Sequence, residues 1–333
     1  MTSSIKPSYD DNRQILASII PLRTPLSIQI EASSVCNFRC KYCIHSSSDM
    51  KNQKVMEWST FLKLCDQIEE FDDRLKQITI AGWGEPLVNK DLPKMISHMK
   101  KMDIAKKIAV GTNGSLLTHD YALQLITAGI DFIKISLQGM TADKYMKISG
   151  VKIDFDEMVN NIEFLHNNKK NCEIYIKVAD IALDEGEKDL FYSTFRNITD
   201  RMYVETILPI FDFDNVSKNG FFDNKKSMNK YGQFHSPTIV CPQPFYMMNV
   251  TAMGDILPCC AYYDPTNFGN ITKTSIKEIW NSRKMKLFLK MMLSKNRKTQ
   301  NLYPVCRDCK IPDVIMSPGD DLDLYADELF KKY

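Results

Sequence analysis

The chain has 333 residues, of which 44% are hydrophobic and 25% are charged, and its formal net charge is +2. These values are ordinary for a globular protein and allow one large α/β domain and a smaller one. The 43 basic residues are nearly balanced by 41 acidic ones, so the composition does not indicate a nucleic-acid-binding surface. The first residues lack an apolar signal core, and no apolar run reaches membrane-spanning length. We therefore expect a cytosolic protein, in which ten cysteines indicate metal binding or catalysis rather than disulfides.

Predicted strands and helices alternate along residues 26–206. The polar, proline-punctuated segment 1–25 precedes them, with one short helix expected near 13–20. The expected strands are 26–32, 77–81, 107–111, 131–137, 172–178 and 201–206. The expected helices are 58–71, 91–102, 120–128, 155–166 and 188–196. Such alternation calls for a parallel sheet with right-handed crossovers, and six repeats predict a partial (β/α)6 barrel of the TIM type, with active residues at the carboxyl ends of the strands.

Alternation along these strands places apolar side chains on one face and polar side chains on the other. The apolar faces should pack under the outer helices, which leaves a polar lumen. The residues expected to line this lumen are Gln29, Glu31, Lys134, Tyr175 and Glu205. Such a lumen suits a polar substrate; the alternative is that these buried groups only satisfy one another.

Three cysteines follow the first strand with the spacing C-x3-C-x2-C, in the run Cys36-Asn-Phe-Arg-Cys40-Lys-Tyr-Cys43. Thiolates are soft ligands, and iron–sulfur clusters are held by cysteines at such short spacings. Three ligands leave one iron of a cubane cluster free to bind something else. A structural zinc or a chance grouping is the alternative, but only His45 follows closely as a further ligand. With Tyr42 before the last cysteine, the run resembles the signature loop of the radical S-adenosylmethionine (radical SAM) enzymes.

The resemblance implies that the open iron binds the amino and carboxylate groups of S-adenosylmethionine. The run Gly82-Trp-Gly84-Glu85-Pro86, after the second strand, is similar to a family motif in which the glycine backbone and the glutamate face the cofactor's ammonium group. By the same resemblance, Asn113 and Ser136 would lie near the ribose or the methionine, and Lys177 near the carboxylate. The cofactor-binding residues implied are Tyr42, Gly84, Glu85, Asn113, Ser136 and Lys177. Taken singly, such residues could also serve in turns or helix caps.

A second group of cysteines lies in residues 241–310. Cys241 is followed by Gly254-Asp-Ile-Leu-Pro-Cys259, then by a Phe-Gly-Asn-Ile run and a helix expected at 275–282. This segment resembles the SPASM domain of radical SAM enzymes. A full SPASM domain has seven cysteines and two clusters, but here no cysteine follows Cys309, which implies a shorter, twitch-like domain with one auxiliary [4Fe–4S] cluster. The implied ligands are Cys241, Cys259, Cys306 and Cys309, for which a structural zinc is the alternative.

Three cysteines are left outside both sets. Cys65 and Cys172 fall on apolar faces of a helix and a strand, and are expected to be small core residues. Cys260 is adjacent to an implied ligand. It is inert, an alternative ligand, or a hydrogen-atom donor to a substrate radical.

The expected division of the chain is an N-terminal extension (1–25), the radical SAM partial barrel (26–206), a linker or substrate-covering loop (207–240), the auxiliary cluster domain (241–310) and a C-terminal helix (311–333). In the last segment, one helical face is expected to dock onto the body of the protein. Its residues are Leu322, Tyr325, Ala326, Leu329 and Phe330.

The resemblance implies reductive cleavage of S-adenosylmethionine to methionine and a 5′-deoxyadenosyl radical, which abstracts hydrogen from a substrate. Our first hypothesis is oxidation of a carbinol in a sugar, aminocyclitol or similar polar metabolite, with Glu205 or Tyr175 as the base. The second is epimerisation or cross-linking of a ribosomal peptide, although residues 1–25 are too few to house a leader-binding domain. The third is a non-enzymatic iron–sulfur or zinc scaffold. The implied partner is a flavodoxin- or ferredoxin-type reductant, with Arg39 and Lys41 on its docking surface.

Overall fold

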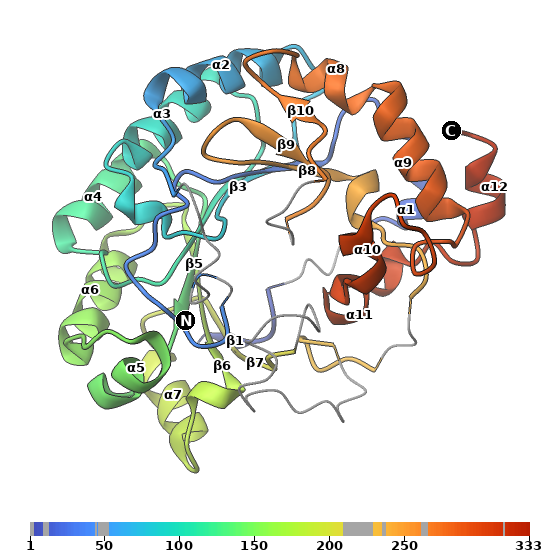
Figure 1. Ribbon diagram of the computed structural model, residues 1–333. Helices are drawn as coiled ribbons and strands as arrows, with labels where there is room; N and C mark the ends of the chain where they lie inside the picture. The colour runs from blue at the N-terminus through green and yellow to red at the C-terminus, as the bar shows by residue number, and fades with distance from the viewer. Residues whose placement is uncertain are drawn as a thin grey trace.

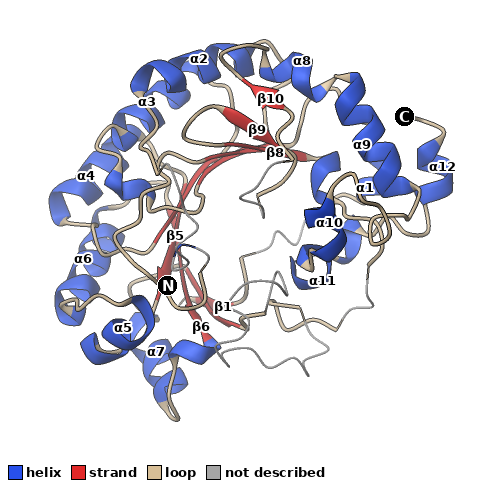
Figure 2. Cartoon of the chain, viewed as in Figure 1, coloured by secondary structure: helices blue, strands red, loops and turns tan. Residues whose placement is uncertain are grey.

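The computed structural model describes residues 3–8, 13–43, 45, 53–208, 229–234, 238–260, 266–315 and 317–333. Six parallel strands form the wall of a partial barrel, and helices cover its outer side (Figures 1 and 2). The strands are β2 (Ser27–Ile30), β3 (Gln77–Ile80), β4 (Ile108–Thr112), β5 (Phe132–Leu137), β6 (Glu173–Ala179) and β7 (Arg201–Glu205). The covering helices are α2 (Trp58–Glu69), α3 (Leu92–Met102), α4 (His119–Ala128), α5 (Ala142–Ser149), α6 (Phe155–Asn168) and α7 (Glu187–Phe195). The predicted partial (β/α)6 barrel is confirmed.

The sheet continues beyond this barrel at both edges. A short strand, β1 (Ser4–Ile5), pairs in parallel with β7. At the other edge, β8 (Met247–Val250) pairs in parallel with β2, with Ser27 opposite Met247, and is followed by the antiparallel strands β9 (Asp255–Leu257) and β10 (Gly269–Asn270). The C-terminal module is therefore joined to the barrel by hydrogen bonds of one ten-stranded sheet.

The core follows from the strand and helix patterns. On β2 the apolar Ile28 and Ile30 are fully buried, while Ser27 and Gln29 are half-buried on the opposite face. On α2 the predicted stripe of Phe61, Leu64, Cys65 and Ile68 is buried against the sheet. Cys65 and Cys172 are both buried and apolar in their surroundings, which confirms the prediction that they are core residues.

The helices of the C-terminal part are α8 (Ile276–Trp280), α9 (Arg283–Leu293), α10 (Pro304–Asp308), α11 (Ile311–Ile315) and α12 (Ala326–Phe330), and α1 (Leu16–Ile19) lies near the N-terminus. The expected C-terminal helix is shorter than predicted. It docks on α9 through Leu322, Ala326 and Leu329, which are buried. Tyr325, at 42% exposed, was wrongly placed on the docking face, whereas Phe330, at 40% exposed, contacts α9, where Lys290 Nζ lies 5.3 Å from the centroid of its ring. The predicted segment 207–240 lies largely outside the described residues.

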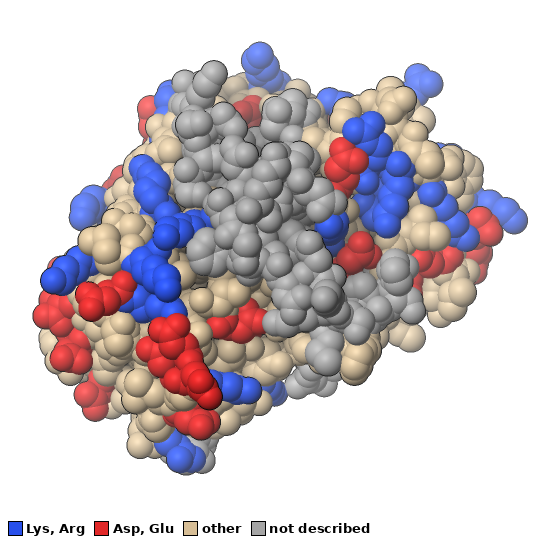
Figure 3. All heavy atoms as spheres, turned by 60° about the horizontal axis from the view of Figure 1, so that its bottom comes forward, with Lys and Arg blue, Asp and Glu red and all other residues tan. Residues whose placement is uncertain are grey.

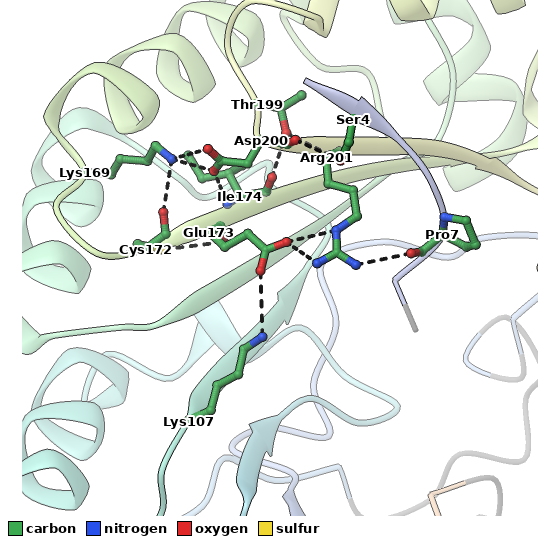
Figure 4. A network of polar contacts seen from close by, with 10 residues as sticks. All are labelled: Ser4, Pro7, Lys107, Lys169, Cys172, Glu173, Ile174, Thr199, Asp200 and Arg201. Atoms are coloured by element: carbon green, nitrogen blue, oxygen red, sulfur yellow. Dashed lines mark hydrogen bonds and ion pairs between the residues drawn. The ribbon is translucent and has the colours of Figure 1, made fainter. Parts of the chain in front are cut away.

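The amino ends of the strands carry a network of ion pairs (Figure 4). The guanidinium of Arg201 on β7 donates to Glu173 on β6, and Lys107 Nζ lies 3.9 Å from the same carboxylate. Asp200 pairs with Lys169 and accepts a hydrogen bond from the backbone N–H of Ile174 at 2.7 Å. These contacts tie β4, β6 and β7 together at the end of the barrel opposite to the cavity described below.

The surface charge is mixed. On the face shown in Figure 3, basic and acidic side chains of the described residues lie next to one another. Within the described part of the chain, no helix is both long and apolar enough to cross a membrane.

Candidate active site

The loop with Cys36, Cys40 and Cys43 follows β2 and is anchored on the end of α5. The backbone N–H groups of Arg39 and Lys41 donate to the carbonyls of Ser149 and Ile148, at 2.8 and 2.9 Å. Phe38, in the middle of the loop, is buried, and its ring meets the edge of Tyr145 at a centroid distance of 6.0 Å. These contacts hold the loop at the carboxyl ends of the strands, where parallel barrels place their chemistry.

A cavity of about 480 Å³ opens at this end of the barrel. The three thiols of the loop line it, together with residues from β3 to β7 and from the C-terminal part. Of the residues singled out from the sequence, those that line it are Cys36, Cys40, Cys43, Tyr42, Gly84, Glu85, Asn113, Lys134, Ser136, Lys177, Glu205 and Cys260. Tyr175 lies just behind this surface, where its hydroxyl donates to Glu205 at 3.3 Å. The structure thus brings the sequence candidates together, and their individual roles stay predictions.

His45 is the further ligand that the sequence left open for the cysteine loop. Its ring is buried, and Nε2 lies 2.9 Å from the carbonyl oxygen of Ser34. It is not among the residues that line the cavity of the three thiols. His45 Nε2 is therefore engaged with the backbone of the loop, and the three cysteines stay the predicted donor set of this cavity.

Glu85 and Gly84 each have a structural task. The carboxylate of Glu85 is buried and accepts hydrogen bonds from the N–H of Leu87 at 3.0 Å, the hydroxyl of Thr112 at 2.6 Å and the N–H of Asn113 at 2.7 Å. Burial raises the pKa of Glu85, and these bonds oppose that rise. A Cβ atom at Gly84 would stand 2.2 Å from the carbonyl oxygen of Ser33, so only glycine allows the two backbones to approach this closely.

Tyr42 ties the cysteine loop to the end of β5. Its hydroxyl donates to Gln138 Oε1, and Gln138 is buried. Burial is the main cause that raises the pKa of Tyr42 well above its usual range. The contact orients the loop, and it leaves the ring of Tyr42 in the cavity wall.

An ion pair lies deeper in the same cavity. Lys177 Nζ on β6 is 2.6 Å from Glu205 Oε2 on β7. Burial raises the pKa of Glu205, but Lys177, Lys230 and Lys134 outweigh it and lower that pKa to about 2. Burial and the neighbouring Glu205 raise the pKa of Tyr175 far above neutrality. Burial, with the charges of Lys177 and Lys230, lowers the pKa of Lys134 to about 8.

Glu31, which was predicted to line the lumen, instead binds backbone N–H groups that follow two neighbouring strands. It is 6% exposed, and its two oxygens accept hydrogen bonds from the N–H groups of Trp83 and Ala252, each at 3.2 Å. Burial raises its pKa, and these two bonds oppose the rise. The other predicted lumen residue, Gln29, faces a polar cavity at the amino ends of the strands.

A second, smaller cavity is lined by the thiols of Cys241, Cys259, Cys306 and Cys309. Cys259 faces this cavity and Cys260 faces the larger one, so adjacent residues serve two chambers. Ile311 lines both chambers and separates them.

The donor sets of the two cavities fit iron–sulfur clusters. All ten cysteines are free of disulfides. Within the described ranges, no group of three or more His, Cys, Asp or Glu side chains is arranged to hold a single metal ion. Zinc needs four sulfurs at about 2.3 Å from one point, whereas a cubane takes each thiolate on a different iron and so needs them spread around a cavity. Burial raises the pKa of Cys43 and of Cys241 to about 11, and iron ligation requires their deprotonation.

Comparison with known families agrees with this geometry. The radical SAM superfamily matches residues 30–187, and the SPASM iron–sulfur cluster-binding domain matches residues 241–310. The chain is a radical SAM enzyme with a C-terminal SPASM domain. Its cofactors are therefore S-adenosylmethionine and [4Fe–4S] clusters, one that binds S-adenosylmethionine and one that is auxiliary.

Two relatives show how far the similarity extends. The tungsten-containing aldehyde ferredoxin oxidoreductase cofactor-modifying protein of Pyrococcus furiosus is 23% identical over 349 residues, which cover 90% of this chain and 92% of the relative. A probable GTP 3′,8-cyclase of Methanococcus vannielii is 35% identical over 128 residues, which cover 38% of this chain and 41% of the relative. The chain thus matches the cyclase over less than half of its length.

Three solved structures have the same fold. BtrN in complex with AdoMet and 2-DOIA has a TM-score of 0.56 at 21% identity, covering 85% of this chain and 92% of BtrN. Native anSMEcpe with bound AdoMet has a TM-score of 0.60 at 17% identity, covering 93% of this chain and 96% of anSMEcpe. Streptococcus suis SuiB bound to its precursor peptide SuiA has a TM-score of 0.54 at 16% identity, covering 90% of this chain and 72% of SuiB. At these identities the likeness establishes the fold alone.

The smaller cavity makes a direct prediction. Cys309→Ala is expected to lower the iron content of the anaerobically reconstituted protein from about eight to about four per chain, because the auxiliary cluster, unlike the first, has no cofactor to occupy the iron that loses its thiolate. The measurement is iron and sulfide per chain, with Cys172→Ala as the matched control that should keep about eight. A full iron complement in Cys309→Ala would contradict the assignment of this ligand.

Proposed function

We propose that this enzyme oxidises a carbinol of a small polar molecule, of the sugar or aminocyclitol kind, by two successive one-electron steps. The observation that carries the proposal is that three cysteines and the Lys177–Glu205 pair line one cavity, while a four-cysteine cavity lies directly behind Ile311. When bound, the first cluster and S-adenosylmethionine supply a hydrogen-abstracting radical, and the second cluster supplies a place for the second electron. BtrN, which shares the fold, was solved in complex with AdoMet and 2-DOIA.

The protein's own part is to hold the substrate and to take its proton. Lys177 and Glu205 offer a donor and an acceptor to the hydroxyl groups of a polar substrate, and their ion pair fixes both side chains in place. Because the pKa of Glu205 is lowered to about 2, its carboxylate is a weak base. Tyr175, with its raised pKa, holds its proton and keeps Glu205 in position. These two residues, which the sequence offered as bases, are therefore better suited to positioning.

Lys134 is the side chain best suited to accept the hydroxyl proton. It projects from β5 into the cavity, and its pKa is lowered to about 8, nearer to neutrality than that of Glu205 or Tyr175. A base is most effective when its pKa is close to the working pH. The neutral amine of Lys134 can take the proton as the carbinol carbon becomes a carbonyl.

The test is an anaerobic assay with S-adenosylmethionine, dithionite and a panel of polyols and aminocyclitols. We expect one or more of these compounds to raise 5′-deoxyadenosine formation and to yield a product two hydrogens poorer, measured by mass spectrometry. We expect Lys134→Met to slow product formation by about 10²-fold or more, with Lys134→Arg no better, since an arginine cannot act as a neutral base. Formation of 5′-deoxyadenosine with an isomeric product of unchanged mass would contradict the oxidation.

Cys260 supports a second candidate, epimerisation of a small molecule or of a ribosomal peptide. Its thiol lines the same cavity as the three loop cysteines, and Gln243 Nε2 donates to its sulfur at 3.5 Å. A thiol in that place could return a hydrogen atom to a substrate radical. In deuterium oxide, epimerisation would place solvent deuterium on carbon and depend on Cys260, whereas the proposed oxidation would do neither.

The electrons are proposed to come from a flavodoxin- or ferredoxin-type protein. Arg39 and Lys41 are exposed on the outer side of the cysteine loop. Acidic reductants are attracted by such basic side chains close to the acceptor. Both residues are thus suitable for a docking surface beside the first cluster.

A further inference from the structure

Arg297 is the largest fully buried side chain of the described structure, at 1% exposure, and it lines the four-cysteine cavity. Its guanidinium donates four hydrogen bonds, all to backbone carbonyls. Nη1 donates to Cys306 and to Cys309, each at 2.8 Å. Nε donates to Ile239 at 3.0 Å and Nη2 to Thr238 at 3.3 Å. One side chain therefore joins the loop that carries two of the thiols to the segment just before a third, Cys241.

The partners of the Arg297 guanidinium among the described residues are four backbone carbonyls, and no described carboxylate forms an ion pair with it within 4 Å. Carbonyl oxygens satisfy its N–H groups but do not neutralise its charge, and a buried charge requires a counter-charge. Two carboxylates lie beside the segment that Arg297 binds, and both accept hydrogen bonds from its backbone: Asp313 from the N–H of Thr238 at 3.0 Å, and Asp323 from the N–H groups of Ile239 and Val240 at 3.0 and 2.8 Å. The four thiols line the same cavity as Arg297, and as thiolates they can supply the negative counter-charge.

Four thiolates around a cubane core leave that group with net negative charge, and reduction adds one more negative charge. A fixed positive charge next to it stabilises the reduced state more than the oxidised state, and does so strongly in a dry site. We infer that Arg297 is a positioning residue that supplies the counter-charge of the auxiliary cluster and raises its reduction potential, so that it can accept an electron. This inference deepens the proposed function, because an oxidation needs such an acceptor.

Arginine suits this place better than lysine for geometry, but not for charge. The planar guanidinium reaches four carbonyls in two separate backbone segments at once, whereas an ammonium group is compact and makes fewer such bonds. Arg297→Lys therefore keeps the positive charge but loses the planar set of N–H donors. Arg297→Gln loses the positive charge. The pair of variants separates an electrostatic role from a purely structural one.

The experiment is a redox titration of the full chain carrying Cys36→Ala, Cys40→Ala and Cys43→Ala. These substitutions remove the first cluster, so that the measured signal comes from the auxiliary cluster alone. Potentials are read by electron paramagnetic resonance. We expect Arg297→Gln to make reduction at least tenfold less favourable, which is a fall of about 59 mV for a one-electron couple. We expect Arg297→Lys to shift the potential by less than half as much. Asp313→Asn, which removes a nearby negative charge, should leave the potential unchanged or raise it.

An unchanged potential in Arg297→Gln would overturn the inference, and so would an equal fall in the lysine and glutamine variants. If the glutamine variant does not retain iron, Arg297→Met takes its place as the neutral variant: a tenfold loss with a near-native potential in Arg297→Lys supports the inference, and an unchanged potential overturns it. The titration uses no substrate. A failed oxidation assay would therefore not change the measured potential of the auxiliary cluster. An unchanged potential in the titration would in turn not affect the prediction that the enzyme forms a radical.

Discussion

Substitution of alanine for Cys36, Cys40 and Cys43 together is expected to abolish formation of 5′-deoxyadenosine and to remove about four of about eight irons per chain. The reason is that these thiols are the predicted donor set of the larger cavity, and the further thiol that lines it, Cys260, cannot hold a cubane cluster in place of three. His45 is engaged with the carbonyl of Ser34. Radical formation depends on the cofactors held here, so its loss should be complete rather than graded.

Cys65→Ala is the matched control, because Cys65 is fully buried on α2 and outside both cavities. It should keep the full iron complement and the rate of S-adenosylmethionine cleavage, at a cost of about 1 kcal/mol in stability from the small void it leaves. Iron, sulfide and 5′-deoxyadenosine are measured on the same samples. Residual cleavage in the triple variant would refute the assignment of the loop.

Glu205→Gln is expected to destabilise the protein by about 3 kcal/mol, because it leaves Lys177 half-buried without its partner and beside two further lysines. The measurement is denaturant unfolding of the reconstituted protein. The double variant Glu205→Gln, Lys177→Met should recover much of that loss, since it removes both members of the pair. Strict additivity of the two single changes would show that the pair contributes nothing.

The same pair has a defined pH dependence. The pKa of Glu205 is lowered from 4.5 to about 2, so its stabilising effect is fully present above pH 4.5 and is lost as the pH falls toward 2. The stability difference between the native chain and Glu205→Gln should therefore be constant from pH 5 to pH 7. A difference that varies within this range would mean that burial has raised the pKa of Glu205 above its ordinary value, because an unshifted pKa gives no pH dependence at all.

Much of the barrel could be predicted because its signals are local. Period-two alternation located all six strands of the barrel to within a few residues, and the stripe of Phe61, Leu64 and Ile68 located α2. The candidate site could be predicted for a related reason: parallel strands end at one edge, so residues that follow different strands are brought into one cavity. That places Asn113 after β4 and Lys177 near the end of β6 in the same wall.

What could not be predicted depends on contacts between distant segments. The pairing of β8 with β2 joins residues about two hundred positions apart, and nothing in either strand's pattern specifies it. Arg297 stands in a polar, lysine-rich stretch that gives no sign of burial, and its acceptors lie in two other segments. Lys230 falls in a segment expected to be a linker, yet it lines the cavity. For Glu205, the base role assigned from residue type did not account for the three lysines around it.

The strand β2 lies between β3 and β8, so both of its edges are occupied by partners of parallel direction. A chain that ends at residue 240 would lack β8, so the N–H and C=O groups along one edge of β2 would be unpaired. Such an exposed strand edge promotes aggregation by pairing with a strand of another molecule. Exchange of SPASM modules between relatives would for the same reason have to preserve the register that sets Ser27 opposite Met247. The sheet, more than the connecting segment, thus determines which pairs of modules are compatible during recombination.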